Sequence, residues 1–177
     1  MKKITTTIAL AAALLGGTVT VTHAAGSNGT DMPAVGSELA TVRKATAGYH
    51  RLDAARDAGF AAFSIDPLDP DTPTCFDNVQ NGGMGVHYVK GIDEDLDPSA
   101  PEAMVYELTD QGPRLVAVEY IVPDVYVDPD APPSLFGQEL HHHSFLPVYI
   151  LHAWVWKDNP AGMFADFNPN VGPCPSD

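Results

Sequence analysis

Four segments between residues 85 and 156 have the length and composition of β-strands, and they constrain the fold more than any other feature of the chain. They are rich in β-branched and aromatic residues and are bounded by Gly, Pro, Asp and Asn. The second and third flank the sequence TDQG, a suitable hairpin turn, so we expect an antiparallel sheet. The four segments are 85–90, 103–108, 114–122 and 148–156.

One helix is expected before these strands. Apolar residues recur at three- and four-residue intervals from Leu39 to Ala55. Ser37 suits the N-cap position and Gly59 suits a C-terminal stop. The pattern therefore predicts an amphipathic helix over residues 38–58, about five turns long.

The order of these elements indicates the fold class. A long N-terminal helix followed by about four strands is typical of an α+β domain, in which the helix packs on one face of an antiparallel sheet. We predict one such domain over residues 37–177. The sheet is expected to curl into a cystatin-like wrap or to close into a small barrel, and we favour the curled open form.

The N-terminal residues have the features of an export signal. Lys2 and Lys3 precede an apolar run over residues 8–17, and small residues approach a cleavage site near residue 25. We predict a secretory signal peptide over 1–25 and a flexible linker over 26–36. The apolar run is about half the length needed to span a bilayer, so we expect no membrane span in the mature chain. The expected location is secreted or extracytoplasmic, in the cell envelope.

The charge of the chain argues against some partners. The formal net charge is −14, and the loss of Lys2 and Lys3 with the signal makes it −16. Such a chain repels nucleic acid and anionic lipid headgroups, so neither is an expected partner. The sequence does not identify a small-molecule or protein partner.

The chain contains two cysteines, Cys75 and Cys174. In an oxidising compartment an isolated pair of this kind usually forms a disulfide, and we predict one here. The alternative is a thiolate metal site or a nucleophilic cysteine, which needs reduced sulfur outside the cytoplasm.

Strand alternation places several polar side chains on apolar rows. In 148–156, His152 shares a face with Trp154 and Trp156. In 114–122, Glu119 shares a face with Leu115, and a carboxylate on a row that faces the core needs a partner.

Two strand histidines provide the partner that Glu119 needs. His87, His152 and Glu119 on neighbouring strands form a suitable set of ligands for a transition metal, Zn or Cu, because neutral imidazole binds these ions well. His143, from the run His141–His143, is a candidate fourth ligand. Each strand histidine taken alone also fits a buried, hydrogen-bonded packing role. The histidine run also fits an exposed loop with weak metal affinity.

Two other functions stay open. A metal-free module would bind an apolar ligand or a partner protein through aromatic residues near the end of the last strand. A hydrolase or isomerase would use His87 or His152 as a general base. The aromatic candidates, which suit a core equally well, are Trp154, Trp156, Phe164 and Phe167. They lie in or next to a final segment that we expect to fold back onto the sheet.

Several motifs together resemble a known group of proteins. The segments GMGVHY, LVAVEY and LHAWVWKDNPAGMF are similar to GMG-x-HY, LVAVEY and LH-x-W-x-W-x-x-NP-x-GMF segments of a family of exported, functionally uncharacterised bacterial proteins. The resemblance covers most of residues 38–174. It implies one exported domain and no particular reaction. His87, Glu119 and His152 lie inside the shared segments, whereas His143 lies outside them.

Overall fold

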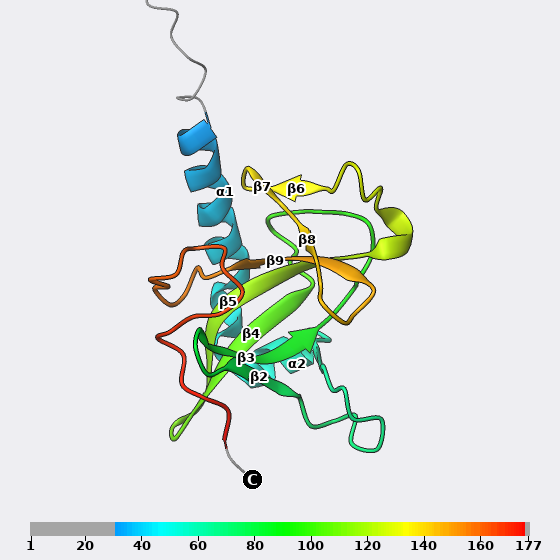
Figure 1. Cartoon of the computed structure of the whole chain (residues 1–177). Coiled ribbons are helices and arrows are strands. Elements are labelled where there is room, and N and C mark those ends of the chain that lie inside the picture. The colour runs from blue at the N-terminus through cyan, green and yellow to red at the C-terminus, as the bar shows by residue number, and fades with distance from the viewer. Residues whose placement is uncertain (1–30, 176–177) are drawn as a thin grey trace, which may run out of the picture.

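The structure is a computed structural model that describes residues 31–175, and it has helices packed on one face of an antiparallel sheet (Figure 1). This confirms the mixed α+β class. The predicted signal peptide and residues 26–30 of the predicted linker lie outside the described residues. The helices are α1 (Asp31–Thr46), η1 (Ala47–His50), α2 (Leu52–Asp57) and η2 (Asp124–Tyr126). The strands are β1 (Ala61–Ala62), β2 (Cys75–Asn78), β3 (Gly82–Val89), β4 (Ala103–Thr109), β5 (Gly112–Pro123), β6 (Ser134–Leu135), β7 (Gln138–Glu139), β8 (His141–His142) and β9 (Val148–Ala153).

The main sheet has seven strands in the order β1-β3-β4-β5-β9-β8, and β2 also pairs with β3. All pairs are antiparallel, and β6 and β7 form a separate two-stranded ribbon. The four predicted strands correspond to β3, β4, β5 and β9. The prediction of about four strands was wrong, because the additional strands are two to four residues long and too short to show alternation. The predicted curled or closed sheet was also wrong, since β8 and the β1/β2 side form separate, unpaired edges.

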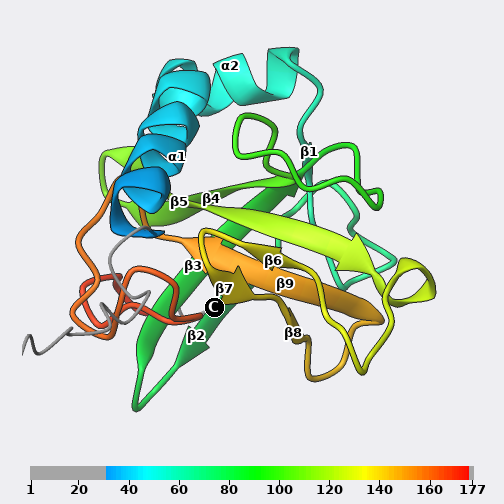
Figure 2. The same cartoon turned by 90° about the horizontal axis from the view of Figure 1, so that it is seen from above.

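The predicted single helix is shorter than expected and is interrupted. Helix α1 begins at Asp31, inside the predicted linker, and ends at Thr46. Pro33 is in the first turn of α1. A proline is compatible with this position, because its missing N–H would have no partner in the first turn. After the tighter turns of η1, Arg51 is extended and α2 starts again in a new direction (Figure 2). The Tyr106 hydroxyl donates to the Tyr49 carbonyl at 2.7 Å, so a tertiary contact satisfies the backbone at this break.

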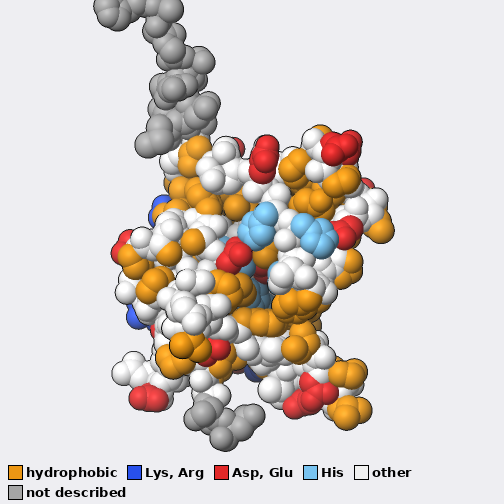
Figure 3. Space-filling model, viewed as in Figure 1, with side chains coloured by type: hydrophobic (Ala, Val, Ile, Leu, Met, Phe, Trp, Pro, Cys, Tyr) orange, Lys and Arg blue, Asp and Glu red, His pale blue; other side chains and the backbone are white. Residues whose placement is uncertain are grey.

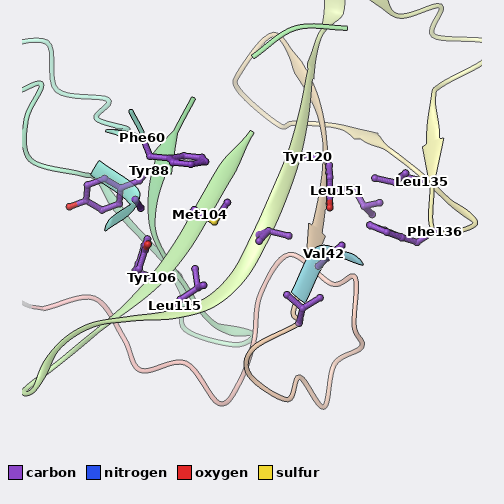
Figure 4. Packing of buried hydrophobic residues seen from close by; sticks show 14 of the residues in the cluster. Val42, Phe60, Tyr88, Met104, Tyr106, Leu115, Tyr120, Leu135, Phe136 and Leu151 are labelled. Carbon is purple, nitrogen blue, oxygen red and sulfur yellow. The ribbon is translucent and has the colours of Figure 1, made fainter. Parts of the chain in front are cut away.

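The helices cover one face of the sheet and form the main hydrophobic core with it. Val42 of α1 and Ala55 of α2 are fully buried there. They belong to one cluster with Tyr106 and Tyr120 of the central strands, and Figure 4 shows how its members surround β4 and β5. The helix layer therefore uses one face of the sheet and leaves the opposite face for other residues.

A β-bulge between β4 and β5 decides which side chains of β5 face the helices. Val105 pairs with Ala117, whereas the next residue of β4 pairs with Leu115, so one residue of β5 is extra. Leu115 consequently packs in the helix-side core. The prediction that Leu115 and Glu119 share one face of the strand was therefore wrong, because strict alternation does not continue through the bulge.

The segment after β9 covers the sheet face opposite the helices, as the fold-back prediction expected. Asn168 forms an isolated bridge with Gly83 of β3, and the Trp154 backbone N–H donates to the Met163 carbonyl at 3.0 Å. Cys75 of β2 and Cys174 form a disulfide, with Cα atoms 5.7 Å apart. The predicted disulfide is thus present, and it fastens this covering segment to the edge of the sheet.

The helices within residues 31–175 are all too short or too polar to cross a membrane.

Candidate metal centre

His87, Glu119 and His152 come from three strands, β3, β5 and β9, and lie on the sheet face opposite the helices. Glu119 of β5 lies directly opposite His152 of β9 in the register. His87 of β3 lies opposite Val105 of β4, and β4 separates it from β5. The small or medium side chains of Ala103 and Val105 on β4 leave room for the longer side chains to meet across that strand. The structure therefore brings these three predicted residues together.

The reactive atoms of the three side chains lie close to one another. His87 Nε2 is 3.3 Å from His152 Nε2 and 3.4 Å from Glu119 Oε2. His152 Nε2 is 3.6 Å from the other carboxylate oxygen, Glu119 Oε1. All three residues are buried, with His152 fully inaccessible. One nitrogen from each imidazole and one oxygen from the carboxylate thus lie within 4.8 Å of one another.

The two histidines have different proton affinities, because burial dominates at His87 and nearby carboxylates dominate at His152. It lowers the pKa of His87 to about 3, and the imidazoles of His152 and His143 act in the same direction. Burial also acts to lower the pKa of His152, but the Glu119 and Asp166 carboxylates outweigh it and raise that pKa above its ordinary value. His87 is consequently a neutral imidazole at neutral pH, while His152 competes for a proton.

The carboxyl group of Glu119 also has a shifted proton affinity. Burial raises its pKa, and the nearby Asp166 carboxylate adds to the rise, whereas His152 and His141 oppose it. An acid with a raised pKa beside a histidine with a raised pKa forms a pair that readily holds one proton. Removing that proton leaves a buried carboxylate and two neutral imidazoles, which is the form that binds a metal ion.

Asp166 is a residue of the site that the sequence did not identify. Its Oδ1 lies 3.6 Å from His152 Nδ1, and its Oδ2 lies 3.2 Å from His141 Nε2. Burial acts to raise the pKa of Asp166, but these two imidazoles outweigh it and hold that pKa well below its usual range. The contact with Asp166 in turn raises the pKa of His141. The one sequence signal for this residue was the expected fold-back of its segment over the His152 strand.

His143 lines the pocket near the triad but is not part of it, and most of the predicted aromatic residues lie elsewhere. His143 Nδ1 accepts the backbone N–H groups of Phe145 and Leu146, so this ring closes its own turn. Trp154 packs in a second buried cluster, and Phe164 stacks on Phe136 with the centroids 5.7 Å apart. Trp156 lies beyond the end of β9 and packs toward α1, where its indole N–H donates to Thr46 Oγ1 at 3.0 Å. Trp154 is therefore a core residue, and Trp156 and Phe164 are partly buried side chains that pack against the main core, because β9 ends at Ala153 and the chain turns away.

A pocket of about 380 Å³ opens on the same face of the sheet and reaches two members of the buried triad. His87 and Glu119 lie at its polar end, together with Asp166 and the run His141–His143. Figure 3 shows this face, with histidine side chains around a hollow that is bordered largely by hydrophobic side chains. Phe167 lines the pocket, as predicted for one of the four aromatic residues. Its apolar wall also includes Phe63, Phe76, Met84, Ile121, Phe145 and Ile150.

Comparisons of the chain with protein families, with characterised proteins and with solved structures found no match. The resemblance to exported bacterial proteins thus stays a prediction, and the function is argued from the site itself.

Proposed function

We propose that this protein binds a transition metal ion, Zn²⁺ in the first instance, through His87 Nε2, His152 Nε2 and a Glu119 carboxylate oxygen. The close approach of these three groups carries the proposal. Ligands bound tetrahedrally at about 2.0–2.1 Å from Zn²⁺ lie roughly 3.3–3.4 Å from one another. The two Nε2 atoms are 3.3 Å apart and His87 Nε2 is 3.4 Å from Glu119 Oε2, which agrees with that spacing, while His152 Nε2 is 3.6 Å from the second carboxylate oxygen, Oε1.

A network of hydrogen bonds explains the same distances less well. Hydrogen bonds that involve nitrogen and oxygen are usually 2.7–3.2 Å long, and an imidazole paired with a carboxylate is at the short end of that range. Two contacts to Glu119 and one contact between imidazoles all exceed it. A buried polar cluster held together only by such long contacts would be poorly compensated for the loss of water. An ion at the centre supplies the missing interactions.

The surroundings of the histidines favour a metal ligand over a general base. A base works best when its pKa lies near the operating pH, and the pKa of about 3 makes His87 a weak base. His152 has a raised pKa but is fully buried and does not line the pocket. The same neutral His87 is well suited to metal binding, because no proton competes for its nitrogen.

Asp166 adds an outer partner to this arrangement. Histidines that bind metals commonly donate their second ring N–H to a carboxylate, which fixes the tautomer and the ring orientation. His152 Nδ1 lies 3.6 Å from Asp166 Oδ1, which is too long for a hydrogen bond, and neither atom has a hydrogen-bond partner in the described part of the chain, so a small movement of either ring or carboxylate would pair them. A proton on Nδ1 leaves Nε2 free for the ion. We therefore assign Asp166 as a positioning residue for His152.

We also propose that the protein acts outside the cytoplasm. The disulfide between Cys75 and Cys174 supports this, because such bonds persist in oxidising compartments. The N-terminal signal expected over residues 1–25 agrees with it. Copper is the second candidate ion in such a compartment, although Cu²⁺ prefers tetragonal geometry and the ligand spacing here favours Zn²⁺.

Metal retention after dialysis tests the proposal. The mature chain is loaded with Zn²⁺ or Cu²⁺ and dialysed, and the bound metal is measured by mass spectrometry together with the circular dichroism of each sample. We expect one zinc ion per chain in the wild type and a loss of that ion in His87→Ala, His152→Ala and Glu119→Gln. Glu119→Gln keeps the size of the side chain and removes its charge, so it separates metal loss from a packing defect.

The matched control is His142→Ala, which removes a histidine from the exposed run near the pocket. His142 Nε2 contacts Asp124 Oδ2 at 3.0 Å. His142 is not a member of the triad and does not contact Asp166 through this nitrogen. We expect this variant to keep its zinc. The proposal is wrong if the wild type retains no stoichiometric metal, or if all variants retain equal amounts.

A further inference from the structure

The pocket beside the triad differs in character from one end to the other. Phe76, Ile121 and Ile150 belong to its apolar wall, and Phe145 and Ile92 lie at exposed positions on its border. Contacts of 3.4 and 3.2 Å join His87 to Glu119 and His141 to Asp166, so these four polar groups lie around the triad, while Asp77 lines the pocket from β2. A cavity that is mainly apolar and has a few convergent polar groups is the usual form of a small-molecule site. This shape suits a molecule with one polar end and one apolar end.

The charge at the polar end determines which molecule fits. Among the described residues the pocket is lined by no Lys or Arg, whereas Asp77, Glu119 and Asp166 are all acidic. Without a metal this lining repels an anion. A divalent ion bound to Glu119 and two neutral imidazoles would carry one net positive charge at the point where a further ligand binds. In a site largely shielded from water, a single anionic group neutralises it far more effectively than a neutral donor does.

The pocket leaves room for a further ligand beside the triad. His152 is fully buried, whereas His87 and Glu119 line the pocket. An ion held by these three groups would therefore be reached from the pocket. Zinc sites with three protein ligands and one open position are those that bind an exchangeable molecule.

We propose that the pocket binds a small amphiphilic monoanion, with its carboxylate-type group on the metal and its hydrocarbon portion against the apolar wall. This inference rests on the proposed metal site. It predicts that both the ion and the wall contribute to affinity. Each methylene buried against the wall contributes about 0.8 kcal/mol, which corresponds to about a fourfold increase in affinity.

The experiment uses a homologous series of probes: acetate, butanoate and hexanoate. Their binding to the zinc-loaded protein and to the metal-free protein is measured by isothermal titration calorimetry, and the zinc content of each sample is measured in parallel. For zinc-loaded protein we expect affinity to rise by about fourfold for each methylene that enters the pocket. Hexan-1-ol, which has the chain without the charge, is expected to bind much more weakly than hexanoate. The metal-free protein is expected to bind no hexanoate.

Two exposed residues on the pocket border allow the wall to be changed without disturbing the core. Phe145 is 61% exposed and Ile92 is 42% exposed. In Phe145→Ser and Ile92→Ser we expect normal zinc content and a smaller gain in affinity from acetate to hexanoate. The control is Val125→Ser, since Val125 is also exposed and does not line the pocket. It should behave as the wild type.

The outcomes distinguish the two proposals. If zinc is retained but acetate and hexanoate bind equally, the amphiphile proposal is overturned and the metal site stands. Equal binding of hexanoate by the zinc-loaded and metal-free proteins also overturns it, because the ion then contributes nothing. If no zinc is retained, the metal site is overturned, and the amphiphile proposal fails with it.

Discussion

Asp166 shows how one side chain from an irregular segment changes the chemistry of a strand histidine. The strand residues His87, Glu119 and His152 follow from alternation, because each stands out on an otherwise apolar row. Asp166 lies in a segment without periodicity, so its contact with His152 Nδ1 could not be predicted from spacing. At the level of single residues, the sequence therefore indicates the three triad residues but not Asp166, which we propose orients His152.

Replacing Asp166 with asparagine tests its role in orienting His152. We expect Asp166→Asn to weaken zinc binding by about 10- to 100-fold, because the outer carboxylate no longer fixes the tautomer of His152. The dissociation constant is measured by competition with a chelator. Asp124→Asn is a matched control, since Asp124 also contacts a histidine and its side chain is similarly exposed, at 35% against 34% for Asp166. Equal dissociation constants for the two variants would contradict the assignment.

The shifted pKa values predict how many protons zinc displaces. His87 has a pKa of about 3 and is already deprotonated at neutral pH, so it releases none. The pKa values of Glu119 and His152 are both raised, and this pair holds one proton that must leave before the ion binds. We therefore expect about one proton released from the triad for each zinc ion near pH 6.5. Calorimetry in buffers with different ionisation enthalpies measures this number, and a value of zero would contradict the shared proton.

Glu102 predicts a separate dependence of stability on pH. Burial raises the pKa of its carboxyl to about 7, even though it accepts the Ile121 N–H at 3.0 Å. Because the folded pKa lies above the unfolded one of about 4.5, this group favours folding below pH 4.5 and that contribution is lost as the pH rises through 7. Between these values Glu102→Gln should gain up to roughly 3 kcal/mol relative to the wild type. Urea denaturation at several pH values measures the difference, and a constant difference would contradict this account.

Among the elements, long strands could be predicted and short ones could not. The strands β3, β4, β5 and β9 each have enough residues to show alternation. The strands β1, β6, β7 and β8 are two residues long, so only their neighbours determine that they pair. The break between η1 and α2 is likewise tertiary, because the hydrogen bond from Tyr106 to Tyr49 stabilises a turn that the apolar periodicity passes over.

The glycines at the start of β3 allow the covering segment to approach closely. A Cβ atom at Gly83 would lie 2.5 Å from the Gly172 carbonyl oxygen and 2.6 Å from Val171 Cγ1. Contacts this short require the backbone to move. This explains the first two glycines of GGMG, Gly82 and Gly83, which allow strand and cover to approach, whereas Gly85 lies against the Tyr106 carbonyl of β4.

Adding one methyl group at Gly83 tests this close approach. We expect Gly83→Ala to lower the free energy of unfolding by about 1–3 kcal/mol, because the cover must move away from the strand. Chemical denaturation measures the change. Gly48→Ala is the control, since a Cβ there meets nothing within 4 Å. It should be neutral or slightly stabilising. Equal stability of both variants would show that the cover adjusts at no cost.

Across the whole molecule, the two faces of one sheet have different roles. The helices cover one face and supply the main core, while the other face bears the triad and the pocket. The amphipathic pattern predicted a helix on one side of the sheet only, and the structure agrees. The fold-back of the final segment was also predicted, but its bridge from Asn168 to Gly83 was not, because that contact joins residues distant in the sequence.

The disulfide predicts a property of the complete fold. It joins residues separated by 99 positions, and in the chain-entropy model a loop of about 100 residues is stabilised by about 4.7 kcal/mol, a figure that native strain often reduces. The double variant Cys75→Ser, Cys174→Ser should therefore unfold at a clearly lower urea concentration than the oxidised wild type. The wild type under reducing conditions should match the double variant. Identical midpoints for the oxidised and reduced proteins would show that the bond adds no stability.

The covering segment carries both Asp166 and Cys174. The bond that fastens this segment to β2 therefore also keeps Asp166 beside His152. Reduction of the disulfide is consequently expected to loosen the surroundings of the triad as well as to lower the stability of the fold.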